Sequence, residues 1–312
     1  MKGSHSKHIG AESLRIPSNC FDTMFLRIAD ITITISSEDP ELKLGVEGAV
    51  KKFVISGASP DVRIRTAWRE LSEETYGEKI FDSATFWQLY DLNGSYLFRF
   101  IFPGRGSLTY KVASFNPDFS LGEVHLRRSF SKPETPIAPL DSSLDQLLVT
   151  NWLAKGRGAL VHACGIVDSL GRGHLFVGQS GAGKSTMARL WENEPNIIVP
   201  SDDRIILRKM KNSIWMYGTP WHGDAGLASP ARAPLTAVYF LEKGQKNEFV
   251  AQKPSDSISR LFSCSFPPFY SGEGIDFTLG FLEDVVKNVP CYELKFQPDK
   301  SVVEFIQEER FT

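Results

Sequence analysis

Gly178-Gln179-Ser180-Gly181-Ala182-Gly183-Lys184-Ser185-Thr186 is the stretch that decides the fold class of this chain. It satisfies the pattern G-x-x-x-x-G-K-[ST] of a phosphate-binding loop, or P-loop. A short apolar run, His174 to Val177, enters the stretch, and a segment with helical character, Lys184 to Asn193, leaves it. A strand before the loop and a helix after it are the context that such a loop requires, which makes a chance glycine-rich turn the weaker alternative.

The chemistry of a nucleotide's phosphates explains these residue types. Glycines let consecutive backbone N–H groups point inward without obstruction by a Cβ atom, and the helix that follows adds the positive end of its dipole. Lys184 supplies a mobile charge to the β- and γ-phosphates, and the Ser185 hydroxyl can ligate Mg²⁺, with Thr186 the less favoured metal contact. The loop therefore predicts phosphate binding but not the reaction that follows.

A pair of carboxylates follows the next apolar run of the chain. Ile197 to Val199 predicts a buried strand, and Asp202 and Asp203 come directly after it, at the edge where phosphates would lie. One carboxylate could orient Mg²⁺ while the other takes a proton from an attacking hydroxyl. A turn or helix-cap pair is the structural alternative.

Five further polar residues are candidates of lower specificity. His162 lies in an apolar run before the loop, where a satisfied core histidine is the commoner explanation. Arg204 follows the aspartates as a phosphate contact or a surface partner. His222 and Asp224 lie in a polar loop suited to substrate or phosphate contact, and Arg232 could reach a phosphate from the next loop.

The chain divides near residues 131–142, where prolines and small polar residues interrupt every periodicity. We expect a β-rich region over 1–137, either accessory or substrate-binding, and an α/β P-loop domain over 138–312. In the first region Ile31 to Ile35 alternates as a half-buried strand does. The segment 61–71 stays open between helix and strand. Four further strands are expected, over Trp87 to Tyr90, Tyr96 to Phe102, Tyr110 to Phe115 and Glu123 to Phe130.

The second region is predicted to open with a helix and to close with one. Leu144, Leu147, Leu148 and Trp152 repeat at helical spacing, with Asp141 or Ser142 as the cap. A strand is expected over 159–167 and another over 213–217. After residue 281 we expect one or two helices around a strand over 291–296, with a packed closing helix.

Composition excludes several classes of protein. The chain has 312 residues, with 35 basic and 37 acidic side chains and a formal net charge of −2, so neither a broad nucleic-acid surface nor a polybasic membrane patch is expected. No apolar run approaches the roughly 18 residues of a membrane span, and the polar first ten residues lack a secretion core. Four separated cysteines without a CxxC pair favour a reduced, cytoplasmic setting.

Three segments in this order resemble the kinase domain of the HPr kinase/phosphorylase family. They read VHACGIV over 161–167, GRGHLFVGQSGAGKST over 171–186 and VPSDD over 199–203. In that family a histidine on a strand precedes the P-loop and a pair of aspartates follows it, which places His162, Asp202 and Asp203 in those positions. The resemblance covers roughly residues 142–241.

The resemblance implies a mixed-sheet nucleotide domain like that of phosphoenolpyruvate carboxykinase. It also implies ATP and Mg²⁺ as cofactors, phosphorylation of a serine hydroxyl on a protein or peptide, and a possible homo-oligomer. The aspartates would act as general base and metal contact, roles that fall to Asp203 and Asp202, although the sequence does not assign them individually. His162 would orient the base or a phosphate oxygen.

Two departures from the family limit what the resemblance implies. Bifunctional members carry Glu where this chain has Thr186, and their second glycine-rich signature has no match between 217 and 253. The resemblance therefore does not imply a reverse phosphorylase activity or HPr as substrate. A kinase acting on a polypeptide is the leading hypothesis, and the alternatives are a small-molecule kinase, a non-catalytic ATP-binding sensor or assembly module, and a carboxykinase-like lyase.

Overall fold

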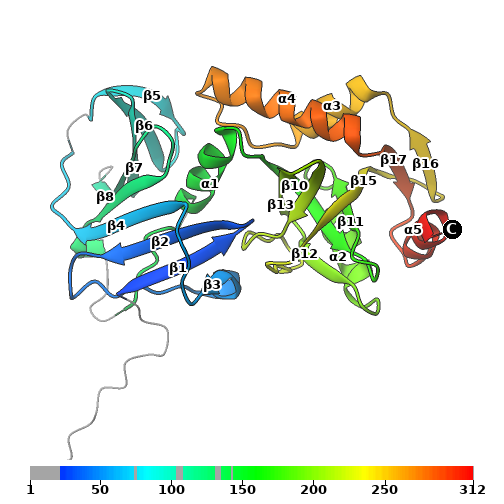
Figure 1. Cartoon of the computed structure of the whole chain (residues 1–312), viewed down its shortest axis with the longest axis horizontal. Coiled ribbons are helices and arrows are strands. Elements are labelled where there is room, and N and C mark those ends of the chain that lie inside the picture. Colours follow the sequence, from blue (N-terminus) through cyan, green and yellow to red (C-terminus); the bar gives the residue numbers. More distant parts are fainter. Residues whose placement is uncertain (1–21, 74–75, 103–107, 131–134, 142, 312) are drawn as a thin grey trace, which may run out of the picture.

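Two mixed β-sheets and five helices build the described part of the chain (Figure 1). This computed structural model describes residues 22–73, 76–102, 108–130, 135–141 and 143–311. The polar first ten residues, Cys20 and Ser142 fall outside these ranges. No helix of the described ranges is both long enough and apolar enough to cross a membrane.

The first sheet has nine strands in the order β3-β1-β2-β4-β9-β8-β7-β6-β5. β4 pairs in parallel with both of its neighbours, and the other pairings are antiparallel. Short 3₁₀ turns lie at Gly48–Phe53 and Arg128–Phe130. The strands are β1 Thr23–Ile28, β2 Ile31–Ser37, β3 Val54–Ile55, β4 Val62–Trp68, β5 Glu78–Asp82, β6 Trp87–Leu92, β7 Ser95–Phe102, β8 Leu108–Phe115 and β9 Leu121–Leu126.

The second sheet has eight strands, and five of them close a ring through the pairings β10–β13, β13–β14, β14–β15, β15–β11 and β11–β10. β12 pairs with β10 outside that ring, and β15 also pairs in parallel with β17. Its strands are β10 Ala159–Val167, β11 Gly173–Val177, β12 Ile198–Ser201, β13 Arg204–Met210, β14 Ser213–Tyr217, β15 Arg232–Lys243, β16 Glu248–Ala251 and β17 Cys291–Phe296.

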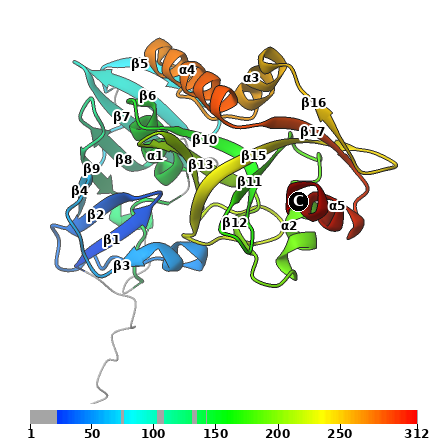
Figure 2. The same cartoon turned by 45° about the vertical axis from the view of Figure 1, so that its right-hand side comes forward.

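Helices cover both faces of the second sheet (Figure 2). α2 (Lys184–Glu192) and α5 (Ser301–Phe311) pack with Cys164, Ile166 and Phe176. α3 (Pro254–Ser263) and α4 (Gly272–Asn288) pack with Val161 and Ala163 instead. Because successive side chains of a strand point to opposite faces, β10 sends His162 toward the same side as Cys164, the side of α2.

α1 (Leu144–Ala154) lies between the two sheets, as both views show. Its buried Leu144, Leu148 and Leu153 belong to one apolar cluster with first-sheet residues and with Leu160 and Ile206 of the second. All strands of the first sheet lie before the expected boundary at 137, and all strands of the second sheet lie after it. The shared core shows that the two regions are packed against one another.

Most of the expected elements are present, and three details differ. The strand expected over 123–130 ends at Leu126 and gives way to a 3₁₀ turn. The strand expected to be buried over 197–199 is β12, whose Ile198 is 47% exposed. The segment 61–71, which the sequence left open, contains β4. The Asp141 carboxylate does not cap α1: it pairs with the buried ammonium of Lys111, and Ser143 occupies the N-cap position without a side-chain hydrogen bond. A buried lysine needs a countercharge more than a helix end needs a cap.

Candidate functional site

The loop over residues 178–183, here called the glycine loop, joins the end of β11 to the start of α2. Gly183 has a φ of 108°, and a Cβ there would lie 2.7 Å from the ring of Phe296. Both the backbone conformation and the close ring therefore require glycine. Gln179, Ser180 and Gly181 are exposed at the crest of the loop, whereas Gly178, Ala182 and Thr186 are partly buried.

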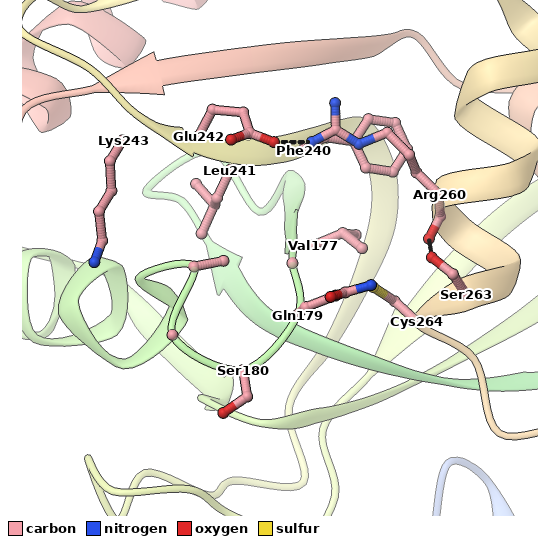
Figure 3. Close-up of a pocket in the computed structure, with 13 residues that line it drawn as sticks. Val177, Gln179, Ser180, Phe240, Leu241, Glu242, Lys243, Arg260, Ser263 and Cys264 are labelled. Carbon is pink, nitrogen blue, oxygen red and sulfur yellow. Dashed lines mark hydrogen bonds and ion pairs between the residues drawn. The ribbon is translucent and has the colours of Figure 1, made fainter.

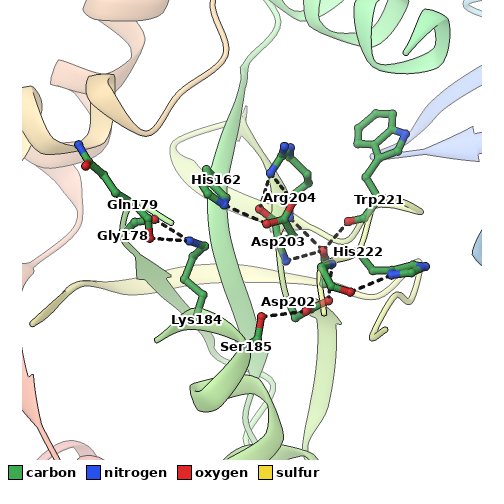
Figure 4. A network of polar contacts seen from close by, with 12 residues as sticks. His162, Gly178, Gln179, Lys184, Ser185, Asp202, Asp203, Arg204, Trp221 and His222 are labelled. Carbon is green, nitrogen blue, oxygen red and sulfur yellow. Dashed lines mark hydrogen bonds and ion pairs between the residues drawn. The ribbon is translucent and has the colours of Figure 1, made fainter. Parts of the chain in front are cut away.

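Lys184 begins α2 and folds back over the glycine loop (Figure 4). Its ammonium donates hydrogen bonds to the carbonyl oxygens of Gly178 at 2.8 Å and Gln179 at 3.0 Å. Burial lowers the pKa of Lys184 below its ordinary value, and the nearby negative charge of Asp203 opposes that shift. An ammonium held in this way is a cation that an anion at the loop could attract.

Asp202 is fully buried at the end of β12 and ties a distant loop to α2. Its carboxylate accepts hydrogen bonds from the backbone N–H groups of Gly223 and Ala225, both at 2.9 Å, and of Leu227 at 3.3 Å. The Ser185 hydroxyl donates to the same carboxylate at 3.4 Å. We call residues 218–228 the aspartate loop because Asp202 holds it in place.

Ser185 and Asp202 offer the oxygen donors that suit Mg²⁺. Among the described residues, no group of three or more His, Cys, Asp or Glu side chains could hold a metal ion. Mg²⁺ in proteins is commonly held by one or two carboxylates together with waters and substrate phosphates. The pair therefore fits a magnesium ion that arrives with a nucleotide, and not a closed all-protein metal site.

Asp203 lies between a histidine and an arginine. Nε2 of His162 is 2.9 Å from one carboxylate oxygen, and the Arg204 guanidinium pairs with the other. Burial by itself would raise the pKa of Asp203, but the His162 hydrogen bond and the charges of Arg204, His162 and Lys184 outweigh it and hold that pKa below its ordinary value. Asp203 is thus kept ionised, with each of its carboxylate oxygens facing a basic side chain.

Strand register explains why His162 reaches Asp203. β10 and β13 pair so that His162 lies opposite Arg204, the residue next to Asp203. The His162 side chain is partly exposed and hydrogen-bonded to Asp203, so it lies at the site and not wholly within the core. Its backbone N–H donates to the carbonyl of Cys264 at 2.7 Å, which brings the segment after α3 to the same site.

Three residues of the site were not predicted. The buried Ser201 hydroxyl donates to the carbonyl of Trp221 and accepts from the N–H groups of Asp203 and Arg204. A Cβ at Gly223 would lie 2.9 Å from the Asp202 carboxylate. The Phe266 ring lies 4.3 Å from the Arg204 guanidinium. Position beside Asp202 could have indicated Ser201, but no sequence signal indicates Phe266.

Of the three remaining residues predicted to contact substrate or phosphate, two lie in the aspartate loop and one lies elsewhere. His222 and Asp224 are exposed in the aspartate loop, where Nδ1 of His222 lies 3.1 Å from the Gly223 carbonyl. Arg189 of α2 donates to the Asp224 carbonyl at 3.0 Å. Arg232 does not join this group, because its guanidinium pairs with Asp30 of the first sheet's β1–β2 turn.

A cavity of about 480 Å³ opens beside the glycine loop (Figure 3). Its walls are Gln179 and Ser180, the end of β15 and the C-terminal half of α3. Arg260 lies in its wall and is held by Glu293 at 2.7 Å and Glu242 at 2.9 Å. A volume of this size lies within the roughly 300–1,000 Å³ of small-molecule sites.

Comparison with known proteins gives likeness only to solved structures. No family model matches this chain, and neither does any curated protein. Among solved structures the chain is similar to the Hpr(Ser) kinase/phosphatase from Coxiella burnetii, with 14% sequence identity and a TM-score of 0.29. The match covers 48% of this chain and 91% of that one. At this distance the functional argument rests on the residues of the site themselves.

Proposed function

We propose that the protein is an ATP-dependent kinase that transfers the γ-phosphoryl group of ATP to a hydroxyl group. The acceptor proposed is the hydroxyl of a serine in a protein or peptide. The observation that carries the proposal is the Asp203 carboxylate, held ionised by His162 and Arg204 beside the glycine loop. Nucleotide binding alone does not need a positioned proton acceptor, whereas transfer to a hydroxyl does.

Nucleotide binding would use the glycine loop and the adjacent cavity. The loop's backbone N–H groups and the start of α2 would hold the phosphates, and Lys184 would exchange its two carbonyl partners for phosphate oxygens. The cavity of about 480 Å³ is large enough for a nucleoside, with Glu242 and Arg260 as polar partners. ATP is the nucleotide proposed, on the resemblance of the three motif segments.

Ser185 and Asp202 would hold Mg²⁺ together with the nucleotide's phosphates. Bound there, the ion would neutralise charge on the β- and γ-phosphates. Asp202 would also keep the aspartate loop in place through its backbone hydrogen bonds. The Asp202 carboxylate would in this way couple Mg²⁺ binding to the conformation of the aspartate loop.

In the transfer step the acceptor oxygen bonds to the γ-phosphorus while the bond from that phosphorus to the β–γ bridging oxygen breaks. The bond electrons leave with ADP, and the acceptor's proton moves to Asp203. Lys184 stabilises the charge on the transferring phosphoryl group. Because phosphoryl transfer passes through a loose transition state, positioning and charge stabilisation matter more than a strong base, so a carboxylate of low pKa suffices.

The first prediction concerns Asp203→Asn. We expect phosphoryl transfer to fall about 10²- to 10⁴-fold, the range for loss of a general base, while ADP affinity is kept. The assay uses γ-labelled ATP, Mg²⁺ and size-fractionated extract of the source cells, with calorimetry for ADP.

Lys184→Ala is the loss-of-transfer control in the same assay. Label in polypeptides supports the proposal, and label in metabolites identifies a small-molecule kinase. Nucleotide binding without any transfer by the unmodified protein would overturn the kinase and favour an ATP-binding module.

A further inference from the structure

An apolar groove of about 190 Å³ lies between the two sheets, on the side of α1 that faces the Phe266 segment. The first sheet contributes Phe81 and Trp87, and α1 contributes Leu147 and Thr150. The opposite wall is the segment from Phe266 to Tyr270, with its two prolines. Among the described residues that line the groove, none carries a charge.

The groove reaches the site around Asp203 through two of its lining residues, Leu160 and Phe266. Phe266 donates its backbone N–H to the Leu160 carbonyl at 3.0 Å, two residues before His162 on β10. Its ring packs against the Arg204 guanidinium at 4.3 Å and lies 6.2 Å from the His162 ring. Both partners of the Asp203 carboxylate therefore lie against Phe266, which lines the groove.

Packing and one hydrogen bond hold the groove open. The rings of Phe81 and Trp87 are stacked at 4.9 Å, and Tyr270 lies 6.0 Å from Phe81. The Tyr270 hydroxyl donates to the Asn151 side-chain oxygen at 2.5 Å, so this hydrogen bond joins the Phe266–Tyr270 segment to α1. A preformed apolar pocket binds an apolar group without first having to rearrange.

The volume of the groove distinguishes between classes of acceptor. About 190 Å³ is well below the roughly 300–1,000 Å³ of sites that enclose a whole small molecule, so the groove suits one large side chain. Phe269 stands at its rim with 66% of its surface exposed, although a large aromatic side chain is usually buried. If the side chain in the groove belonged to a polypeptide acceptor, the neighbouring residues of that polypeptide would cover the Phe269 ring.

We propose that this groove binds a large apolar side chain of a polypeptide acceptor. That side chain would be close in sequence to the serine whose hydroxyl proton moves to Asp203. The inference rests on the proposed kinase function and narrows it from any hydroxyl to a polypeptide with an apolar anchor. It also gives the first sheet a part in substrate selection, because Phe81 and Trp87 form one wall.

The test is phosphorylation of a serine peptide library in which each position beside the acceptor is varied. We expect selection of Leu, Met, Phe or Trp at one fixed position. Phe269→Ala should raise KM for a selected peptide about tenfold with kcat unchanged, which is the pattern of lost uniform binding. ADP affinity, measured by calorimetry, should not change.

Leu170→Ala is the matched control, since Leu170 is 68% exposed in the β10–β11 turn, beyond the end of β10 that is opposite to the groove-lining Leu160. Peptides phosphorylated without apolar selection, or equal KM values for the two variants, would overturn the groove while leaving the kinase in place. Label that enters metabolites but no peptide would overturn the polypeptide acceptor. No transfer to any acceptor would overturn the proposed function itself.

Discussion

Three neighbouring side chains from different elements keep the Asp203 carboxylate ionised. His162 comes from β10, Arg204 is adjacent in sequence, and Lys184 comes from α2. Their combined effect lowers the pKa of Asp203 although burial raises it. The residue is therefore ionised over a wider acid range than an isolated aspartate.

His162→Ala is predicted to move the acid limb of the pH–rate profile to higher pH. Removing the hydrogen bond raises the pKa of Asp203, and activity is lost as pH falls through that pKa, so the loss begins earlier on acidification. The stability that the depressed pKa contributes, present at neutral pH and lost on acidification, also shrinks. The measurement is kcat against pH.

His125→Ala on β9 is the matched control, because His125 lies near Glu123 on the first sheet. An acid limb that does not move in His162→Ala would mean that Asp203 does not titrate in the step.

At the scale of elements, α1 is the helix on which both sheets depend. Leu148 is fully buried in the cluster that α1 shares with the first sheet and with Leu160. Leu148→Ala should lower the free energy of unfolding by about 2–5 kcal/mol, because it leaves a cavity in a packed core. Urea denaturation measures the change.

Leu279→Ala makes the same substitution on α4, where Leu279 is 36% exposed. We expect a change within about 0.5 kcal/mol. Equal losses for the two variants would mean that Leu148 adds no more to stability than an exposed leucine, and that the cluster around α1 is not a packed core.

Elements of the second sheet were largely predictable because their signals are local. The apolar run of β10, the strand–loop–helix of residues 173–192 and the strand at 291–296 are readable from local composition and from the glycine-loop motif. β4 stayed ambiguous because Trp68 and Leu71 fit either period, and pairing with β2 and β9 settled it. Tertiary contacts override local preference in such a segment.

At the scale of the whole molecule, the aspartate loop is fastened to α1 and to the first region. The Trp221 indole N–H donates to Asp145 of α1 at 2.5 Å, and Lys52 donates to the Ala228 carbonyl at 2.9 Å. Arg232, just beyond the loop, pairs with Asp30. The loop that Asp202 holds is therefore held from the other side too.

Trp221→Phe should weaken this connection while keeping an aromatic ring in place. Burial already raises the pKa of Asp145, and the variant removes the indole donor that opposes this shift. Loss of one buried hydrogen bond costs about 1–3 kcal/mol of stability, and ADP affinity should fall as the loop loosens. Urea denaturation and calorimetry measure the two effects.

Trp215→Phe on β14 is the matched control, because its ring lies near Arg232 and outside the aspartate loop. Unchanged stability and ADP affinity in Trp221→Phe would show that α1 does not support the loop.

The sequence by itself determined the glycine loop, the strand and helix around it, the aspartate pair and the β-rich character of the first region. Each of these is written in consecutive residues, where spacing and periodicity have a direct physical meaning. Only the tertiary structure decided that His162 bonds Asp203, that Arg232 pairs with Asp30 and that Phe266 packs on Arg204. Those contacts join residues far apart in the chain, and strand register and packing, not local pattern, bring them together.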